Sequence, residues 1–474
     1  MRRARFVAAG VTALLLLVVP VTSAQAAPGP PDAPQWWFDS WKVPTLWADG
    51  ARGQGITIAE VDTGVNASLP ELSANVLPGK DFGNPALDGR TDHEVAQFGH
   101  GTAMASLMVA QPGTAGITGL APDAKVLPIA VPLTGTDDAV DGGSDHINDA
   151  IRYAADAGAK IISLSLGGSR TETPGAMPCP QGEQDAITYA IGKGAIVVAA
   201  SGNSGQVGSP VEDPAVCLGV VSVGAVDSQN RVAAFSSRHP FLTVTAPGVK
   251  IPTLSRMPGV AYKGDGTSQA TALTSAALAV VWSKYPTLTG RQVLARLLAT
   301  LDRSSTTRDP AYGFGIINLQ KAVRTAVPTT APNPVYAALD PFVARQAAAA
   351  KSAALPSAPP AAAAPLPAVG ALVDPAPGSL TGRVMTGILV ALGGLLAFLV
   401  LSAIGFLRWR HRRRSRQPVA AIPYAALAYP AAPVGRNGRP EPTAATSEES
   451  GVVWHDVTDI VPASPFHRGN LSRP

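Results

Sequence analysis

Three short segments of this sequence contain the residue types that hydrolyse acyl bonds. Asp62 lies in Val-Asp-Thr-Gly-Val, His100 in Gly-His-Gly-Thr and Ser268 in Gly-Thr-Ser, in that order along the chain. A serine hydroxyl attacks a peptide carbonyl only when a base removes its proton, and a histidine oriented by a carboxylate can act as that base. We therefore predict that Asp62, His100 and Ser268 form a catalytic triad that cleaves peptide bonds through an acyl-enzyme.

Each of these residues also has an ordinary structural explanation. A serine that begins a helix is a favoured N-cap, and an aspartate at the end of a strand often forms a turn. The combined motifs favour catalysis, because Ser268 follows a Gly-x-Gly-Thr turn and begins an alanine-rich run, while His100 has a glycine on each side. Three other histidines lack that glycine context: His93, His146 and His239.

Asn203 is a candidate for a fourth part of the site. It lies in Ala-Ala-Ser-Gly-Asn-Ser-Gly, where its side-chain amide can donate a hydrogen bond to the oxyanion of the tetrahedral intermediate. Asn-Ser-Gly is also a good turn sequence, so that alternative stays open. Two glycine-bearing segments can present an extended edge to a substrate strand and form a neutral pocket of small to medium size. The predicted substrate-binding residues are Ser165, Leu166, Gly167, Ala200 and Gly202.

Alternating strand and helix patterns position these residues. A helical pattern runs from Ser144 to Ala157 and meets Gly158 at a helix-ending position. Such alternation predicts an α/β fold, a parallel sheet with helices on both faces. Ligands of these folds bind beyond the carboxyl ends of the strands, where Asp62 and Asn203 lie. Short apolar runs predict the strands at 56–61, 126–131, 160–164, 195–200 and 220–223.

Composition and charge do not favour a nucleic-acid-binding protein. The formal net charge is only +4, from 37 Lys and Arg against 33 Asp and Glu, and much of the excess lies in one arginine run at 408–416. A basic run beside an apolar stretch is a membrane-topology signal. We expect a polypeptide substrate, no nucleic acid, no cofactor and no metal ion.

Both ends of the chain carry signals for export and anchoring. Residues 1–26 combine three arginines, an apolar run and Ala-Gln-Ala, which predicts a cleaved signal peptide, with a membrane anchor as the alternative. Residues 384–407 contain no charge and are long enough to span a bilayer. The arginine run that follows predicts a cytoplasmic C-terminus. The protein is thus expected in the cell membrane as a single-pass type I protein with its peptidase domain outside.

These signals divide the chain into further regions. The Trp-rich extension at 27–50 is expected to pack onto the peptidase domain at 51–327, because a disordered leader carries few aromatics. A Pro/Ala-rich linker follows at 328–383, and the tail at 408–474 is expected to be disordered. In an oxidising compartment Cys179 and Cys217 are expected to form a disulfide, with two buried thiols as the alternative.

The sequence resembles the subtilisin-like serine proteases from about Gly53 to Val327, including Gly-Phe-Gly-Ile-Ile-Asn at 313–318. More narrowly it resembles the mycosins, membrane-anchored subtilases of actinobacterial type VII secretion systems. That likeness rests on residues 41–62, 77–82 and 121–129, the signal peptide and the anchor. It implies a subtilisin-like fold with one C-terminal transmembrane helix and the type VII secretion membrane complex as a partner. It carries over as catalytic positions Asp62, His100, Ser268 and Asn203.

The sequence departs from the usual subtilase pattern directly after Ser268. Gln269 stands where subtilases usually have methionine or an aromatic residue, and Ala272 stands where they have proline. These changes remove no triad atom, but they motivate a second hypothesis of a different class. In it the protein is a structural subunit that stabilises the secretion complex with weak or absent proteolysis. A tethered protease of general function is a third hypothesis.

Overall fold

The computed structural model describes residues 35–94, 98–113, 115–133, 143–169, 179–353 and 453–456. The chain divides into two compact units, and the described helices and strands all belong to the first, which comprises residues up to Ala354 and from Ser447 onward. Among the described helices, none has the length and apolar character that crossing a bilayer requires. The predicted signal peptide at 1–26 and membrane span at 384–407 lie outside the described residues, so both stay predictions.

A seven-stranded sheet forms the centre of the domain, and every pair of neighbouring strands is parallel. Its order is β2-β3-β1-β4-β6-β8-β9. Apart from the two-residue edge strand β2, the strands are short, mostly apolar and buried on both faces, as is typical of a parallel sheet. They are β1 (Thr57–Asp62), β2 (Lys80–Asp81), β3 (Lys125–Ala130), β4 (Ile161–Leu164), β6 (Ile196–Ala200), β8 (Val221–Val226) and β9 (Val244–Pro247).

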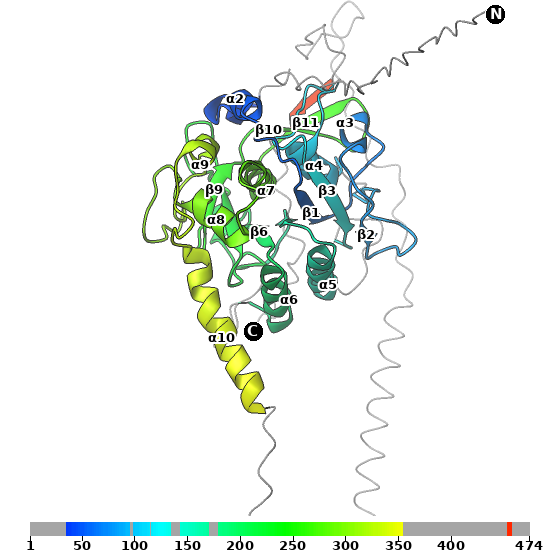
Figure 1. Cartoon of the computed structure of the whole chain (residues 1–474). Helices are drawn as coiled ribbons and strands as arrows, with labels where there is room; N and C mark the ends of the chain where they lie inside the picture. Colours follow the sequence, from blue (N-terminus) through cyan, green and yellow to red (C-terminus); the bar gives the residue numbers. More distant parts are fainter. Residues whose placement is uncertain are drawn as a thin grey trace, which may run out of the picture. The chain divides into compact units, whose positions relative to one another are not determined.

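Helices cover both faces of this sheet (Figure 1), which confirms the predicted α/β class. Helices α4 (His100–Val109) and α7 (Thr267–Lys284) pack together on one face, and α5 (Gly143–Asp156) and α6 (Gln181–Gly192) pack together on the other. Helix α7 contacts five of the seven strands and is almost entirely buried. The helix that carries the predicted nucleophile therefore lies across the centre of the sheet.

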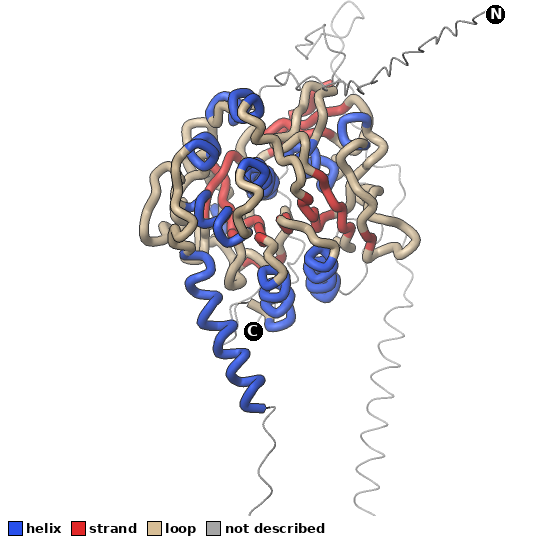
Figure 2. The backbone as a smooth tube through the Cα atoms, in the orientation of Figure 1, coloured by secondary structure: helices blue, strands red, loops and turns tan. Residues whose placement is uncertain are grey.

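Smaller elements surround the central layers (Figure 2). Strand β5 (Gly168–Ser169) pairs antiparallel with β7 (Glu212–Asp213), and β10 (Ile251–Leu254) pairs antiparallel with β11 (Val260–Gly264). The remaining short helices are α3 (Pro70–Ser73), the 3₁₀ turn η1 (Gly205–Val207), α8 (Gly290–Leu298) and α9 (Leu319–Arg324).

The N-terminal extension is part of the folded domain, as the sequence predicts. It forms α1 (Trp36–Ser40) and α2 (Val43–Ala48), and its tryptophans enter the core. The Trp41 indole N–H donates to the carbonyl of Ile317, and that of Trp47 donates to the carbonyl of Leu120. Buried indoles whose N–H groups are satisfied combine a large apolar contact with a fixed direction. The extension is thereby hydrogen-bonded to two segments that are distant from it in the sequence.

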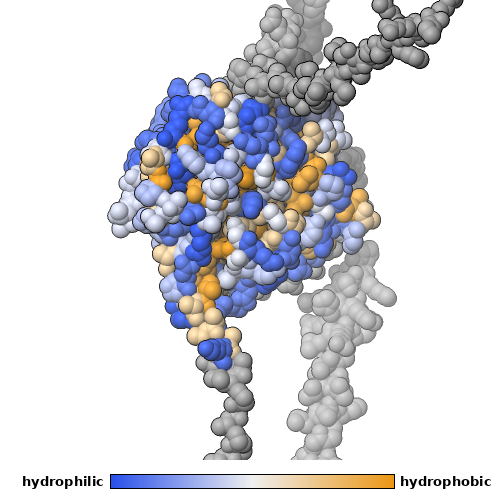
Figure 3. Space-filling view, in the orientation of Figure 1, coloured by the Kyte–Doolittle hydropathy of each residue, from blue (hydrophilic) through white to orange (hydrophobic). Residues whose placement is uncertain are grey.

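Two segments differ from the predicted boundaries. Residues 334–353, predicted as the start of an extended linker, form helix α10, because alanine is the strongest helix former. Its first turns bury Val335, Tyr336 and Leu339 against the domain, and apolar surface continues along the part that leaves it (Figure 3). Residues Val453–Asp456, predicted as disordered tail, form strand β12, parallel to β11. The rest of the tail lies outside the described residues.

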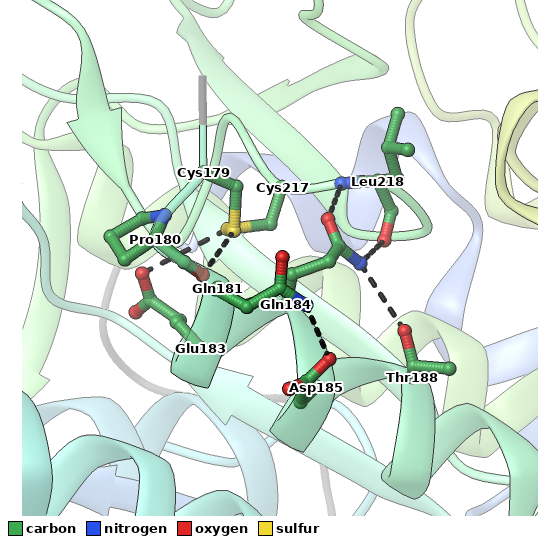
Figure 4. Close-up of a disulfide and its surroundings, with 9 residues drawn as sticks. All are labelled: Cys179, Pro180, Gln181, Glu183, Gln184, Asp185, Thr188, Cys217 and Leu218. Carbon is green, nitrogen blue, oxygen red and sulfur yellow. Dashed lines mark hydrogen bonds between the residues drawn. A yellow bond between two sulfur atoms is a disulfide. The ribbon is translucent and has the colours of Figure 1, made fainter. Parts of the chain in front are cut away.

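A disulfide joins Cys179 and Cys217, as the sequence predicts, which excludes two free thiols (Figure 4). Gln184 on α6 reinforces this link by accepting a hydrogen bond from the Leu218 N–H at 2.8 Å and donating one to the Leu218 carbonyl at 3.0 Å. Glu183 Oε2 lies 3.8 Å from Cys217 Sγ. This cluster is not a metal site, because a cysteine binds metal as a thiolate and both sulfurs are in the disulfide.

Candidate active site

The structure brings Asp62 and His100 into direct contact. Asp62 ends β1 and is fully buried, and His100 begins α4. His100 Nδ1 lies 2.8 Å from Asp62 Oδ1 and 3.0 Å from Oδ2. The backbone N–H of Thr63 also donates to Asp62 Oδ1. These bonds make Nδ1 the protonated nitrogen and leave Nε2 as the basic nitrogen, with 33% of the His100 side chain exposed.

Burial and nearby carboxylates act in opposite directions on the pKa of His100. Burial lowers the pKa of His100, but the charge of Asp62 and its hydrogen bond outweigh this, and Glu94 and Asp92 add to the effect. The result is a pKa raised from 6.5 to about 9. The backbone N–H of His100 donates to Glu94 Oε2 at 2.7 Å, which places that carboxylate at the start of α4. The imidazolium form, which must exist during acyl transfer, is therefore strongly stabilised.

Asp92 is a supporting residue that the sequence analysis missed. Its Oδ1 accepts from the Thr63 hydroxyl at 2.9 Å, and its Oδ2 accepts from the N–H and hydroxyl of Thr102 at 2.9 and 2.5 Å. Burial raises the pKa of Asp92 and these hydrogen bonds lower it. Asp92 thus ties the end of β1 to the first turn of α4 and fixes the separation of Asp62 from His100. Its sequence signal was an aspartate shortly before the His100 motif.

The glycines around His100 permit close backbone contact. A Cβ at Gly101 would lie 2.1 Å from the Gly64 carbonyl oxygen, so only glycine fits there. Gly64 itself has a φ of +92° and passes equally close to the carbonyl of Thr91. The two glycine motifs of the sequence are therefore two sides of one contact between β1 and α4.

Ser268 lies in the first turn of α7 and is not its N-cap. The N-cap is Gly266, which has no side chain, so the ordinary explanation of this serine as a capping residue is wrong. The Ser268 hydroxyl donates to the Ser165 carbonyl at 2.8 Å, and the Ser165 hydroxyl donates to the Ser268 carbonyl at 3.1 Å. Within the described residues no hydrogen bond joins Ser268 to His100. The hydroxyl is directed at the segment predicted to bind substrate.

Asn203 is held by Thr267, the residue directly before Ser268. Its Oδ1 accepts two hydrogen bonds from Thr267, from the N–H and from the hydroxyl, both at 2.9 Å. Because a backbone N–H can only donate, the atom that faces it is the amide oxygen. The NH₂ group must then point away from Thr267, which leaves it available as a hydrogen-bond donor.

The predicted substrate-binding residues lie on two neighbouring segments. Ser165, Leu166 and Gly167 follow β4, whereas Ala200 ends β6 and Gly202 follows it, and β6 pairs with β4. The predicted neutral lining stays a prediction, and the buried Glu212 side chain lies close to both glycines. A Cβ at Gly202 would lie 2.9 Å from Glu212 Oε1, and one at Gly167 would lie 3.4 Å from Oε2. Glu212 is the first residue of β7 and comes soon after Gly202 in the sequence.

The two residues that depart from the subtilase pattern are accommodated in α7. Ala272 is fully buried and the helix continues through it. The carboxamide of Gln269 lies against Gly264 and Gly266, and its Oε1 is buried with no hydrogen-bond partner among the described residues. The change therefore places a buried amide oxygen, without a hydrogen-bond partner in the described part of the chain, next to Ser268 while the helix geometry is kept.

The other histidines are engaged elsewhere. His93 Nε2 lies 2.6 Å from Asp81 Oδ2, and the His239 ring stacks on Phe241. The His146 ring lies 6.0 Å from the ring of Phe82. Among the described histidines, His100 is the one in contact with Asp62.

Comparison with known proteins agrees with this geometry. The model of the Subtilase family matches residues 53–315. Subtilisin E of Bacillus subtilis (strain 168) is 34% identical over 290 residues, covering 60% of this chain and 69% of that protein. Subtilisin of Bacillus pumilus is 34% identical over 290 residues, covering 60% of this chain and 96% of that protein.

Similar solved structures include proteases of secretion systems. The MycP3 protease from the type VII (ESX-3) secretion system has a TM-score of 0.54 and 29% identity, covering 63% of this chain and 89% of that chain. MycP1 from Mycobacterium smegmatis has a TM-score of 0.54 and 25% identity, covering 63% of this chain and 87% of that chain.

Proposed function

The chain belongs to the subtilase family and is a serine endopeptidase, and we propose that Asp62, His100 and Ser268 are its catalytic triad. The observation that carries the proposal is the contact of His100 Nδ1 with the buried carboxylate of Asp62 at 2.8 Å. It leaves Nε2 of the same ring as the base for a serine hydroxyl.

In the proposed mechanism Ser268 changes its hydrogen-bond partner. Its hydroxyl turns from the Ser165 carbonyl to His100 Nε2, which accepts the proton as Oγ attacks the scissile carbonyl. The Asn203 amide and the Ser268 N–H at the start of α7 stabilise the oxyanion. His100 then donates its proton to the leaving amine, and a water repeats the sequence in reverse to release the acyl group.

The substrate is proposed to bind as an extended strand along Ser165, Leu166 and Gly167. The backbone of these residues continues from β4, a sheet strand, and Gly167 is exposed. Main-chain hydrogen bonds to such an edge give affinity for many sequences, and side-chain contacts give selectivity. Cleavage of a casein-type unfolded protein by the wild type, and its loss in Ser268→Ala, tests this activity.

We further propose that the peptidase is anchored in the cell membrane and acts in a type VII secretion system. Its structural relatives include MycP3, a protease of such a system, and MycP1. The support is that likeness together with the apolar stretch at 384–407 and the arginine run after it. The proposed substrates are exported polypeptides. Co-purification of secretion-membrane proteins with the detergent-extracted full chain tests the partnership, and recovery of the protein alone would contradict it.

The proposed anchor predicts the compartment in which the C-terminal tail lies. It puts residues after 407 in the cytoplasm, whereas the pairing of β12 with β11 in one chain requires both in one compartment. Labelling of a cysteine introduced at Ser447 with a membrane-impermeant maleimide in intact cells decides between them. Protection supports the single-pass topology, and labelling supports the β11–β12 pairing.

A structural role in the secretion complex is the second candidate, favoured by Gln269 and its unsatisfied amide oxygen next to Ser268. It predicts that Ser268→Ala leaves secretion intact. The enzymatic proposal predicts that the same variant assembles normally but leaves exported substrates uncleaved.

A further inference from the structure

Ser237 is hydrogen-bonded to the residues directly before and directly after Asn203. Its N–H donates to the Gly202 carbonyl at 2.9 Å, and its hydroxyl oxygen accepts from the Ser204 N–H at 3.1 Å. Ser237 is completely buried, so these bonds are shielded from competing water. One residue therefore holds the backbone on both sides of the proposed oxyanion donor.

The segment that carries Ser237 is itself attached to the central sheet. The hydroxyl oxygen of the neighbouring Ser236 accepts from the Ala225 N–H at 3.0 Å, and the Ala233 N–H donates to the Ala225 carbonyl at 2.9 Å. Ala225 belongs to β8, which is buried along its length. Ser237 thus connects the loop after β6 to a strand of the sheet and not to another loop.

The Asn203 amide needs a support on each side, because glycines near it give the backbone conformational freedom. Gly202 has a φ of +104°, a conformation that favours glycine, and Gly205 follows shortly after Asn203. Thr267 holds the amide oxygen, and Ser237 holds the backbone from which the side chain starts. A donor stabilises an oxyanion only when it lies about 2.7–3.1 Å from it. The direction of the NH₂ group is thus set by Thr267 and Ser237 together.

We propose that Ser237 is a positioning residue that acts on catalysis through the Asn203 amide. This inference rests on the proposed oxyanion role of Asn203. Truncating the Ser237 hydroxyl removes the bond from the Ser204 N–H and leaves the bond of its own N–H to Gly202, so the loop is kept while the amide is less well placed. The loss falls on the transition state, because the oxyanion exists there and not in the bound substrate.

Steady-state kinetics of the full-length protein on a chromogenic peptide amide test the proposal. Active sites are titrated with a fluorophosphonate, so that only folded enzyme is counted. Ser237→Ala is expected to lower kcat by about three- to tenfold, the cost of one neutral hydrogen bond, with KM unchanged. Ser237→Cys nearly keeps the volume and offers only a weak acceptor, so it should lower kcat as well.

Ser236→Ala is the matched control. Ser236 is as buried as Ser237 and also accepts one backbone N–H, but that N–H lies in β8 and not in the loop that carries Asn203. Loss of the Ser236 hydroxyl should lower thermal stability and leave kcat unchanged.

The Asn203→Ala background separates positioning from a general loss of structure. Because Ser237 acts through the Asn203 amide, Ser237→Ala should have no further effect on kcat once that amide is absent. The same loss in both backgrounds, or equal kcat of Ser237→Ala and Ser236→Ala, overturns the proposal. An Asn203→Ala enzyme as active as the wild type, or a folded wild type in which Ser268 takes up no fluorophosphonate, would instead contradict the proposed function, and this inference with it.

Discussion

The side-chain oxygen of Asn203 accepts both the N–H and the hydroxyl of Thr267, the residue directly before Ser268. Thr267 thereby holds the proposed oxyanion donor, Asn203, next to the proposed nucleophile, Ser268. Removing the amide in Asn203→Ala is expected to lower kcat by about 10²–10³-fold with little change in KM, a magnitude taken from the corresponding subtilisin substitution. Steady-state kinetics on a peptide substrate check this.

Thr267→Val tests whether the hydrogen bonds from Thr267 position the Asn203 amide. It keeps the N–H bond to Asn203 and removes the hydroxyl bond, so kcat is expected to fall by a smaller factor, about tenfold for one neutral hydrogen bond. Equal activity of Asn203→Ala and the wild type would show that this amide does not serve the oxyanion.

The acid limb of activity reports His100. Only neutral imidazole is a base, and the pKa of His100 is raised to about 9 by Asp62, reinforced by Glu94 and Asp92. Activity is therefore expected to rise with pH up to about 9, well above the ordinary histidine value of about 6.5. The measurement is kcat/KM between pH 5 and 10, at constant ionic strength.

Two variants test whether the acid limb of the pH–activity profile comes from His100. Glu94→Gln removes one negative neighbour and is expected to move the midpoint to lower pH while activity remains. Asp62→Asn is expected to reduce kcat by about 10⁴-fold, because the tautomer is lost. An acid limb that stays in place in Glu94→Gln would contradict the electrostatic assignment.

Glu60 lies two residues before Asp62 on β1 and makes the domain sensitive to alkaline pH. It is 1% exposed. Burial, then the charges of Asp62 and Asp92, raise the pKa of Glu60 well above 4.5. Glu60 is thus protonated in the folded protein over a pH range in which the unfolded chain has it ionised.

Because the pKa of Glu60 is higher in the folded than in the unfolded protein, stability falls as pH rises. The contribution of Glu60 to stability is fully present below pH about 4.5 and is lost progressively as pH rises toward its folded pKa. Glu60→Gln lacks this loss, so its thermal stability relative to the parent should increase with pH. Melting curves between pH 4 and 9 in a Ser268→Ala background, which prevents self-digestion, measure the difference. A difference independent of pH would mean that Glu60 is not protonated.

The N-terminal extension is expected to be required for folding. Trp37 is completely buried in the core, so Trp37→Ala should lower the free energy of unfolding by about 3–5 kcal/mol. Ser40→Ala, at an exposed position of the same helix, is the control and should change it by less than about 0.5 kcal/mol. Urea unfolding of both variants checks this, and equal midpoints would show that the extension is only loosely attached.

The sequence predicted the parts of this structure that depend on local pattern. The apolar runs became β1, β3, β4, β6 and β8 because a strand buried on both faces must be apolar along its length. The glycine motifs located Asp62 and His100, since close passage of the chain at Gly64 and Gly101 excludes other residues.

Other features depend on contacts between distant segments, which no local pattern encodes. Asp92 acts through hydrogen bonds to Thr63 and Thr102, and Glu212 reaches Gly167 and Gly202 by the β5–β7 pairing. Helix α10 was missed because a Pro/Ala-rich composition suits both an extended linker and, where alanine predominates, a helix.

The reactivity of Ser268 is the central claim, and a fluorophosphonate probe measures it most directly. The account predicts that the folded wild type is labelled at Ser268, that Ser268→Ala is not labelled, and that His100→Ala is labelled far more slowly. A wild type that melts cooperatively yet takes up no probe at pH 9 would contradict it.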